Sequence, residues 1–285
     1  MRARLVVSVL LAASVAAMTG VRAQGPPAPA APPRSPRAAA PVDLTGVWVS
    51  VVTEDWQWRM VTPPKGDYAS VPLNAEGTRV ADTWTPAKDG QCEAYGVGGI
   101  MRMPGRLRIS WQDDATLKIE TDAGQQMRLL RFAGSIPGPA PRTPASAPLP
   151  KRTLQGDSVA EWQGGGGGTL DVFTGRVDGG GAQRWGSLKV RTTNMRAGWL
   201  RRNGVPYSEN AVITEYFTRF TNAAAGDWFV VTTQVDDPTY LTQPFITSTN
   251  FKLEANDSKF KPSPCAIDPP VERGEAVFSS DRILR

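Results

Sequence analysis

The chain of 285 residues contains no histidine. This absence excludes Ser-His-Asp and Cys-His catalysis, and it excludes zinc, copper or haem held by histidine in the usual forms. Any chemistry must therefore use carboxylates, tyrosine, lysine, arginine or backbone dipoles. The carboxylates are scattered along the chain, and none follows the twelve-residue spacing of a calcium loop. We predict no metal site and no cofactor.

Cysteine is also scarce, with only Cys92 and Cys265 in the whole chain. In an oxidising compartment, two such residues favour a disulfide that ties the C-terminal part of the chain back to the first third. Two buried thiols are the alternative at this stage.

Long apolar runs are missing except at the N-terminus. Arg2 and Arg4 precede an apolar stretch over residues 5–17, and Val21-Arg22-Ala23 forms a small-x-small cleavage site. This pattern is typical of a secretory signal. The apolar stretch is shorter than the about 20 residues that a spanning helix needs. We predict a signal peptide over residues 1–23, cleavage near Ala23, a periplasmic or secreted mature protein, and no transmembrane segment.

Blocks of positive charge are absent as well. The formal charge is +5, and loss of Arg2, Arg4 and Arg22 with the signal lowers it to +2. No stripe of lysine or arginine remains that would bind phosphate backbones, so we expect no nucleic-acid partner.

Composition divides the remainder of the chain. Residues 24–41 are almost entirely Pro, Ala, Gly, Ser and Arg, which predicts a disordered tether. A single β-barrel domain is expected over 42–268, with flexible insertions at 135–152 and 163–186 that are rich in proline and glycine, and a C-terminal tail over 269–285.

Residues after Val42 alternate between apolar and polar side chains with period two, which indicates strands. We predict about eleven of them, at 45–53, 55–61, 106–112, 116–121, 126–132, 158–163, 170–174, 187–193, 211–220, 227–235 and 244–253. One short helix is expected over 75–84, with Asn74 as its N-cap. Many consecutive strands with few helices favour an all-β, antiparallel, lipocalin-like barrel of roughly 10–11 strands, because closure removes exposed edges. A β-sandwich is the alternative.

Several segments carry a resemblance to a known group. Gly46 and Trp48 form a G-x-W pattern at the start of a long strand, as in lipocalin-type barrels. Together with the order of the later segments, including Asp237-Pro238 and Pro244, the chain resembles a group of uncharacterised secreted bacterial proteins with a lipocalin-like barrel. The resemblance implies a fold and a location, and it transfers no activity.

Candidate acid–base residues gather around the segment 200–220. Glu215 shares a strand face with Ile213 and Phe217, so an inward orientation would desolvate its carboxyl and raise its pKa. Tyr207 follows Pro206 in a segment expected to be a loop at a barrel mouth. Asp236 at a strand end and Glu161 are further catalytic candidates. For the carboxylates the alternatives are pairing with a neighbouring cation or turn capping.

Candidate ligand-binding residues are mostly aromatic, since aromatic walls suit an apolar or aromatic molecule. They are joined by arginines that form an anion-binding cluster with Tyr207 if they lie close in space. The set is Trp48, Trp56, Trp58, Arg102, Trp111, Arg196, Arg202, Phe217 and Trp228.

Three functions are compatible with these features. The first is an exported barrel that binds a small apolar or aromatic molecule. The second is a cofactor-independent lyase, isomerase or cyclase that acts on such a molecule, and the third is a cell-surface interaction protein. The sequence gives no indication of the oligomeric state.

Overall fold

The computed structural model describes residues 34–88, 92–132, 151–164, 169–170, 177–178, 186–222, 224–266 and 270–271. The predicted signal peptide, the first part of the tether, and most of the two insertions and of the tail lie outside these residues. So does most of the strand predicted at 170–174. The described residues belong to one compact unit that begins at Arg34.

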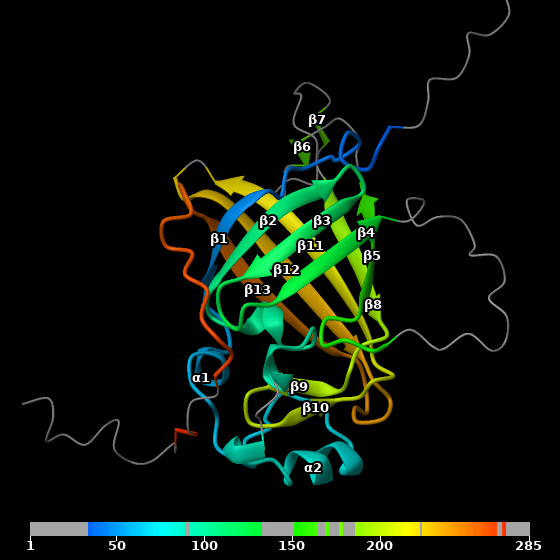
Figure 1. Ribbon diagram of the computed structural model, residues 1–285, viewed down its shortest axis with the longest axis vertical. Helices are drawn as coiled ribbons and strands as arrows, with labels where there is room; N and C mark the ends of the chain where they lie inside the picture. Colours follow the sequence, from blue (N-terminus) through cyan, green and yellow to red (C-terminus); the bar gives the residue numbers. More distant parts are fainter. Residues whose placement is uncertain are drawn as a thin grey trace, which may run out of the picture. The chain divides into compact units, whose positions relative to one another are not determined.

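Nine strands close into a barrel in the order β1-β13-β12-β11-β8-β5-β4-β3-β2 (Figure 1). The all-β barrel prediction is therefore confirmed. The nine strands are β1 (Gly46–Val51), β2 (Arg106–Asp113), β3 (Thr116–Thr121), β4 (Met127–Phe132), β5 (Asp157–Gln163), β8 (Ser187–Thr193), β11 (Val212–Asn222), β12 (Gly226–Asp236) and β13 (Phe245–Leu253). Two short pairs lie outside the barrel: β6 (Thr169–Leu170) with β7 (Val177–Asp178), and β9 (Gly198–Arg201) with β10 (Val205–Tyr207).

One pairing departs from the expected antiparallel pattern. Strands β4 and β5 are parallel, with Leu130 opposite Ser158 and Phe132 opposite Ala160, whereas every other neighbouring pair in the barrel is antiparallel. Parallel neighbours need a crossover of a dozen or more residues. The proline-rich connection over 133–156 provides that length.

Of the two α-helices, one was predicted from the sequence and the other lies where a strand was predicted. Helix α2 (Ala75–Ala81) begins as predicted, because the Asn74 side chain accepts a hydrogen bond from Gly77 N at 2.8 Å. The strand predicted at 55–61 is wrong, since Trp56–Arg59 form the helical turn α1. Asp55 adopts a left-handed conformation (φ 52°) before this turn, and its carbonyl accepts from Arg59 N. The turn exposes Trp56 and buries Arg59.

A cap covers the end of the barrel at which β11 begins (Figure 1). It consists of α1, α2, the β9–β10 hairpin and three 3₁₀ turns: η1 (Pro86–Lys88), η2 (Glu93–Tyr95) and η3 (Ile100–Arg102). A second apolar core joins cap and barrel, because Leu200, Val205 and Tyr207 pack with Ile213 and Val235 of the barrel strands.

The other end of the barrel is covered by residues 34–43, which include the last part of the predicted tether. Trp162 Nε1 donates to Pro36 O at 2.8 Å, Arg37 N donates to Asp114 O at 3.0 Å, and Arg219 donates to Asp43 O. Residues 34–41, which composition assigned to the tether, thus take part in contacts with the barrel.

Candidate functional site

The lumen of the barrel is filled with side chains. Its inward-facing residues include Trp48, Leu130, Phe217 and Phe229, all of which expose 0% of their surface. Trp48 meets Phe229 edge-on at 4.7 Å between ring centroids, and Phe229 stacks on Phe251 at 4.8 Å. A ligand has no room in the part of the lumen that these residues occupy.

Glu215, whose orientation the sequence left open, faces inward and is paired with Arg128. The two terminal guanidinium nitrogens of Arg128 each donate to one carboxylate oxygen of Glu215, one of them at 2.9 Å. Strands β8 and β5 separate β11 from β4, so this ion pair crosses the lumen. Glu215 exposes 0% and Arg128 exposes 1% of their surface, and the carboxylate is out of reach of solvent.

Tyr207 lies in β10 of the cap rather than in a loop, so that expectation is corrected. It is fully buried, and burial raises the pKa of its hydroxyl well above the ordinary value. A Cβ atom at Gly96 or Gly198 would lie 2.2 or 2.6 Å from the hydroxyl oxygen. Glycine at these two positions therefore leaves room for the Tyr207 hydroxyl.

The four catalytic candidates do not converge. Asp236 lies at the end of β12, where it accepts from Gln234 Nε2 at 2.8 Å. Glu161 pairs with Lys189 at 2.9 Å on the outer face of β5 and β8. An acid–base role for any of the four stays a prediction, and the geometry brings no two of them to one solvent-accessible site.

Three of the ligand-binding candidates do converge, at a pocket in the cap. We call it the arginine pocket, and it is lined by Trp58, Arg59, Ala94, Gly99, Arg102, Met103, Leu200, Arg201 and Arg202. The space that a water-sized group can occupy in it is about 10 Å³, which is enough for about one water molecule. Helix α1, η3 and the β9–β10 hairpin each contribute arginines to it.

The four arginines of the pocket are almost completely buried, with exposures of 2% for Arg59, 6% for Arg102, 4% for Arg201 and 8% for Arg202. Burial lowers the pKa of Arg59 to about 10; Glu54 acts in the opposite direction, and the charge of Arg102 lowers the pKa further. Four guanidinium groups thus line one pocket, where Glu54 and Asp55 pair with Arg59 and Arg102, and guanidinium groups are suited to binding anions.

Hydrogen bonds fix the guanidinium groups in place. Arg59 donates through Nε to Arg102 O at 3.0 Å, through Nη2 to Ser50 Oγ at 3.0 Å, and through Nη1 to Glu54. Arg102 Nη2 donates to Asp55 Oδ2 at 2.8 Å, and Arg202 Nη2 donates to Arg59 O at 2.6 Å.

Trp58 supplies an aromatic wall. Its indole nitrogen donates to Asp67 Oδ1 at 3.1 Å, and the guanidinium of Arg201 lies over the ring at 4.5 Å from the centroid. Met103 and Leu200 add apolar surface. The arrangement therefore combines positive charge with aromatic and aliphatic contacts, which suits a small molecule that carries both kinds of group.

The other ligand-binding candidates lie elsewhere. Trp48 and Phe217 belong to the packed lumen. Trp111 stacks on Phe132 at 5.6 Å at the opposite end of the barrel. Trp56 is 65% exposed, and Trp228 meets Lys252 on the outer face of the barrel.

Arg196 is only partly buried, and it does not line the arginine pocket. Its backbone nitrogen donates to Thr153 O at 2.7 Å.

The sequence did not point to Arg59, Met103 or Leu200. The strand expected at 55–61 includes Arg59, and only the helical turn of α1 brings it beside Arg102. The available signal for α1 is the spacing of Trp56 and Arg59, which lie three positions apart, as neighbours on a helix do. Because the same stretch also alternates, the two periods compete.

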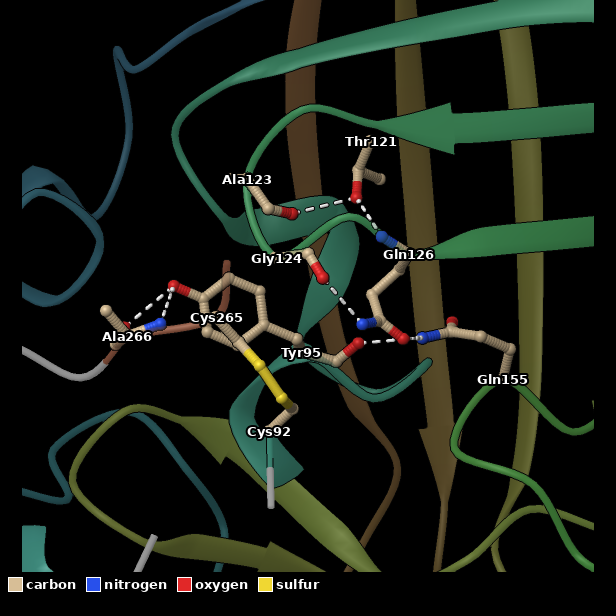
Figure 2. The surroundings of a disulfide bond; sticks show 9 residues. All are labelled: Cys92, Tyr95, Thr121, Ala123, Gly124, Gln126, Gln155, Cys265 and Ala266. Atoms are coloured by element: carbon tan, nitrogen blue, oxygen red, sulfur yellow. Dashed lines mark hydrogen bonds between the residues drawn. A yellow bond between two sulfur atoms is a disulfide. The ribbon is translucent and has the colours of Figure 1, made fainter. Parts of the chain in front are cut away.

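The disulfide lies next to the arginine pocket. Cys92 and Cys265 are bonded, with their Cα atoms 5.6 Å apart, which confirms the predicted pairing. Figure 2 shows Tyr95 beside the bond, with its hydroxyl donating to Ala266 O at 2.7 Å. Tyr95 O in turn accepts from Gln155 Nε2 at 2.8 Å. Since Cys92 immediately precedes η2, which contains pocket residue Ala94, the bond anchors one wall of the pocket.

The C-terminal segment is held along the outside of the barrel before it reaches the disulfide. Glu254 pairs with Arg106 at 2.8 Å and Asp257 with Arg108 at 3.2 Å. Ser263 N donates to Asp122 O at 2.8 Å.

Within the described part of the chain, no helix has the length and apolar character needed to cross a membrane. Comparison of the chain with protein-family models, with curated protein sequences and with solved structures found no match.

Proposed function

We propose that this protein is an exported binding protein that takes a small apolar or aromatic molecule at the opening of the arginine pocket. One observation carries the proposal: Trp58, Arg102 and Arg202, each selected from the sequence as ligand-binding, line the same pocket. Convergence of three selected residues on one concave site is what a binding function requires. The disulfide and the N-terminal signal pattern support export.

The filled lumen supports the cap rather than the barrel interior as the place of binding. Phe217 and Trp48, which were expected to line a cavity, pack against other core side chains and are inaccessible to solvent. The same observation favours a second candidate, a cell-surface interaction protein, because a barrel filled with side chains serves as a rigid scaffold for its outer surface.

Tryptophan fluorescence tests the proposal. The mature protein is titrated with a panel of small aromatic and apolar compounds, and the mixtures are analysed by mass spectrometry for conversion. We expect quenching at micromolar concentrations without any new product.

Two variants locate the signal. Trp58→Phe removes most of the quenching, whereas Trp111→Phe, at the other end of the barrel, retains it. Absence of binding below millimolar concentration for every compound contradicts the proposal, and quenching that survives Trp58→Phe contradicts the assigned site.

A further inference from the structure

Arg102 is a residue of the arginine pocket with an incomplete set of hydrogen bonds. Its Nη2 donates to Asp55, but its Nη1 is buried and has no hydrogen-bond acceptor. The side chain as a whole is only 6% exposed. Nη1 carries two N–H donors, and a buried donor of a charged group that lacks an acceptor is strongly unfavourable. An acceptor that enters the pocket would remove this penalty.

Neighbouring Arg59 does not offer a comparable donor. Each of its three guanidinium nitrogens already donates, to Arg102 O, to Glu54 and to Ser50. These bonds hold Arg59 against the backbone of Arg102. We therefore expect an acceptor that enters the pocket to bond to Arg102 Nη1 rather than to Arg59.

The size of the enclosed space limits what the acceptor can be. About 10 Å³ holds roughly one water-sized group. One oxygen of a flat carboxylate fits such a space. A phosphate or phosphonate presents three oxygens in a tetrahedral arrangement and needs a wider one.

The surroundings indicate how the rest of the ligand is held. Trp58, Met103 and Leu200 line the same pocket as Arg102, and Arg201 covers the Trp58 ring at 4.5 Å. Since only one small group enters the pocket, the apolar or aromatic atoms bonded to the carboxylate would lie at its opening and contact Trp58 and Met103, which are only partly buried, while the buried guanidinium groups offset the negative charge. This combination favours an acid over its uncharged analogue.

We infer that the ligand of the arginine pocket is a carboxylic acid with an apolar or aromatic body, whose carboxylate accepts a hydrogen bond from Arg102 Nη1. The inference rests on the proposed function and names the chemical class of the molecule. Asp55 limits the affinity, because its carboxylate occupies the other terminal nitrogen of the same guanidinium.

The test compares acids with their own amides, which have nearly the same shape and no charge. Benzoate, phenylacetate, 1-naphthoate and octanoate, each paired with its primary amide, are titrated by calorimetry into the mature protein. We expect at least one acid to bind about tenfold or more tightly than its amide, as for a hydrogen bond to a charged group. Phenylphosphonate should bind more weakly than phenylacetate.

Variants assign the preference to Arg102. Arg102→Gln should make acid and amide bind equally, whereas Arg108→Gln, on the outside of β2, should leave the preference unchanged. Asp55→Asn removes the competing carboxylate and keeps Arg102, so it should tighten acid binding about two- to fivefold. This variant also provides a test if Arg102→Gln fails to fold.

The outcomes separate the two proposals. If acids and amides bind the wild-type protein equally, or if phenylphosphonate matches phenylacetate, the inference is overturned while the binding function stands. It is also overturned if Arg102→Gln keeps the preference for acids, or if Asp55→Asn weakens their binding. If neither acids, amides nor the wider panel bind, the proposed function itself fails.

Discussion

Replacing Glu215 by leucine tests how much the fold depends on the ion pair that crosses the lumen. The substitution removes the only residue to which Arg128 Nη1 and Nη2 are seen to donate in the described part of the chain. It leaves a guanidinium that is 1% exposed without these two carboxylate acceptors. Breaking a buried pair on one side costs about 3–5 kcal/mol, because the remaining charge is uncompensated.

The corresponding change in melting temperature is large enough to measure. For a domain of this size, 1 kcal/mol shifts the melting temperature by about 2–4 °C, so Glu215→Leu should lower it by about 6–20 °C. Unfolding in guanidinium chloride without reductant, followed by circular dichroism, gives the change in the free energy of unfolding.

A second variant distinguishes the lost ion pair from lost packing. Replacing both residues, Glu215→Leu with Arg128→Met, removes both charges and fills the space with apolar atoms. Such replacements are often neutral or stabilising, so the double variant should recover most of the loss. A cost below about 1 kcal/mol for Glu215→Leu alone, or a double variant as unstable as the single one, would refute the reasoning.

Three further predictions concern the framework of the fold. Replacing Cys92 and Cys265 by alanine should lower the free energy of unfolding by up to about 5 kcal/mol, because the disulfide closes a loop spanning 173 positions; a melting temperature that matches that of the oxidised wild type would contradict this. Asn74→Ala should lower the free energy of unfolding in denaturant by about 1 kcal/mol through loss of the α2 N-cap, and no measurable change would show that the Asn74 side chain is dispensable there. Burial, followed by the hydrogen bond to Asp82, raises the pKa of Tyr68 to about 12 from 10.0, so the stability it contributes is complete below pH 10 and is lost as the pH rises through 12; Tyr68→Phe should flatten the stability curve over this window, and an unchanged curve would oppose the assignment.

The barrel was predictable because its strands have a regular period and a consistent inner face. On β12, Phe229, Val231 and Val235 point inward, and on β13 Phe245 and Phe251 do the same. Alternation of this kind predicts which side chains share a face, and the face with more apolar atoms lies inward. The helix at α2 was equally clear from its capping residue.

The content of the lumen was not predictable in the same way. Whether inward side chains meet or leave a cavity depends on the barrel radius and on how rings such as Trp48 and Phe229 pack together. Neither can be inferred from the sequence of a single strand. The partner of Glu215 could not be predicted either, because Arg128 lies 87 positions away in the sequence and three strands away around the barrel.

Only part of the arginine pocket could be predicted from the sequence. Its residue types were recognised at Trp58, Arg102 and Arg202, but their meeting point depends on how three irregular segments pack against one end of the barrel. Arg59 was missed because the alternation around Trp56 and Trp58 is typical of a strand, whereas the left-handed conformation at Asp55 starts a helical turn.

Both ends of the barrel are covered by segments that sequence patterns treat as connections. The cap closes one end through the core around Tyr207, and residues 34–43 cover the other through Pro36 and Asp43. Because the lumen is filled and its ends are covered, the barrel serves as a rigid support. The irregular cap then provides the concave surface, as loops on rigid scaffolds commonly do.

We propose that binding takes place in the cap and not in the barrel. A crystal structure of the mature protein with the tightest-binding acid of the panel is the most direct test. We expect density for the ligand against Trp58, with a carboxylate oxygen at hydrogen-bond distance from Arg102 Nη1. Density inside the barrel, with Phe217 displaced and the pair of Glu215 and Arg128 opened, would contradict it.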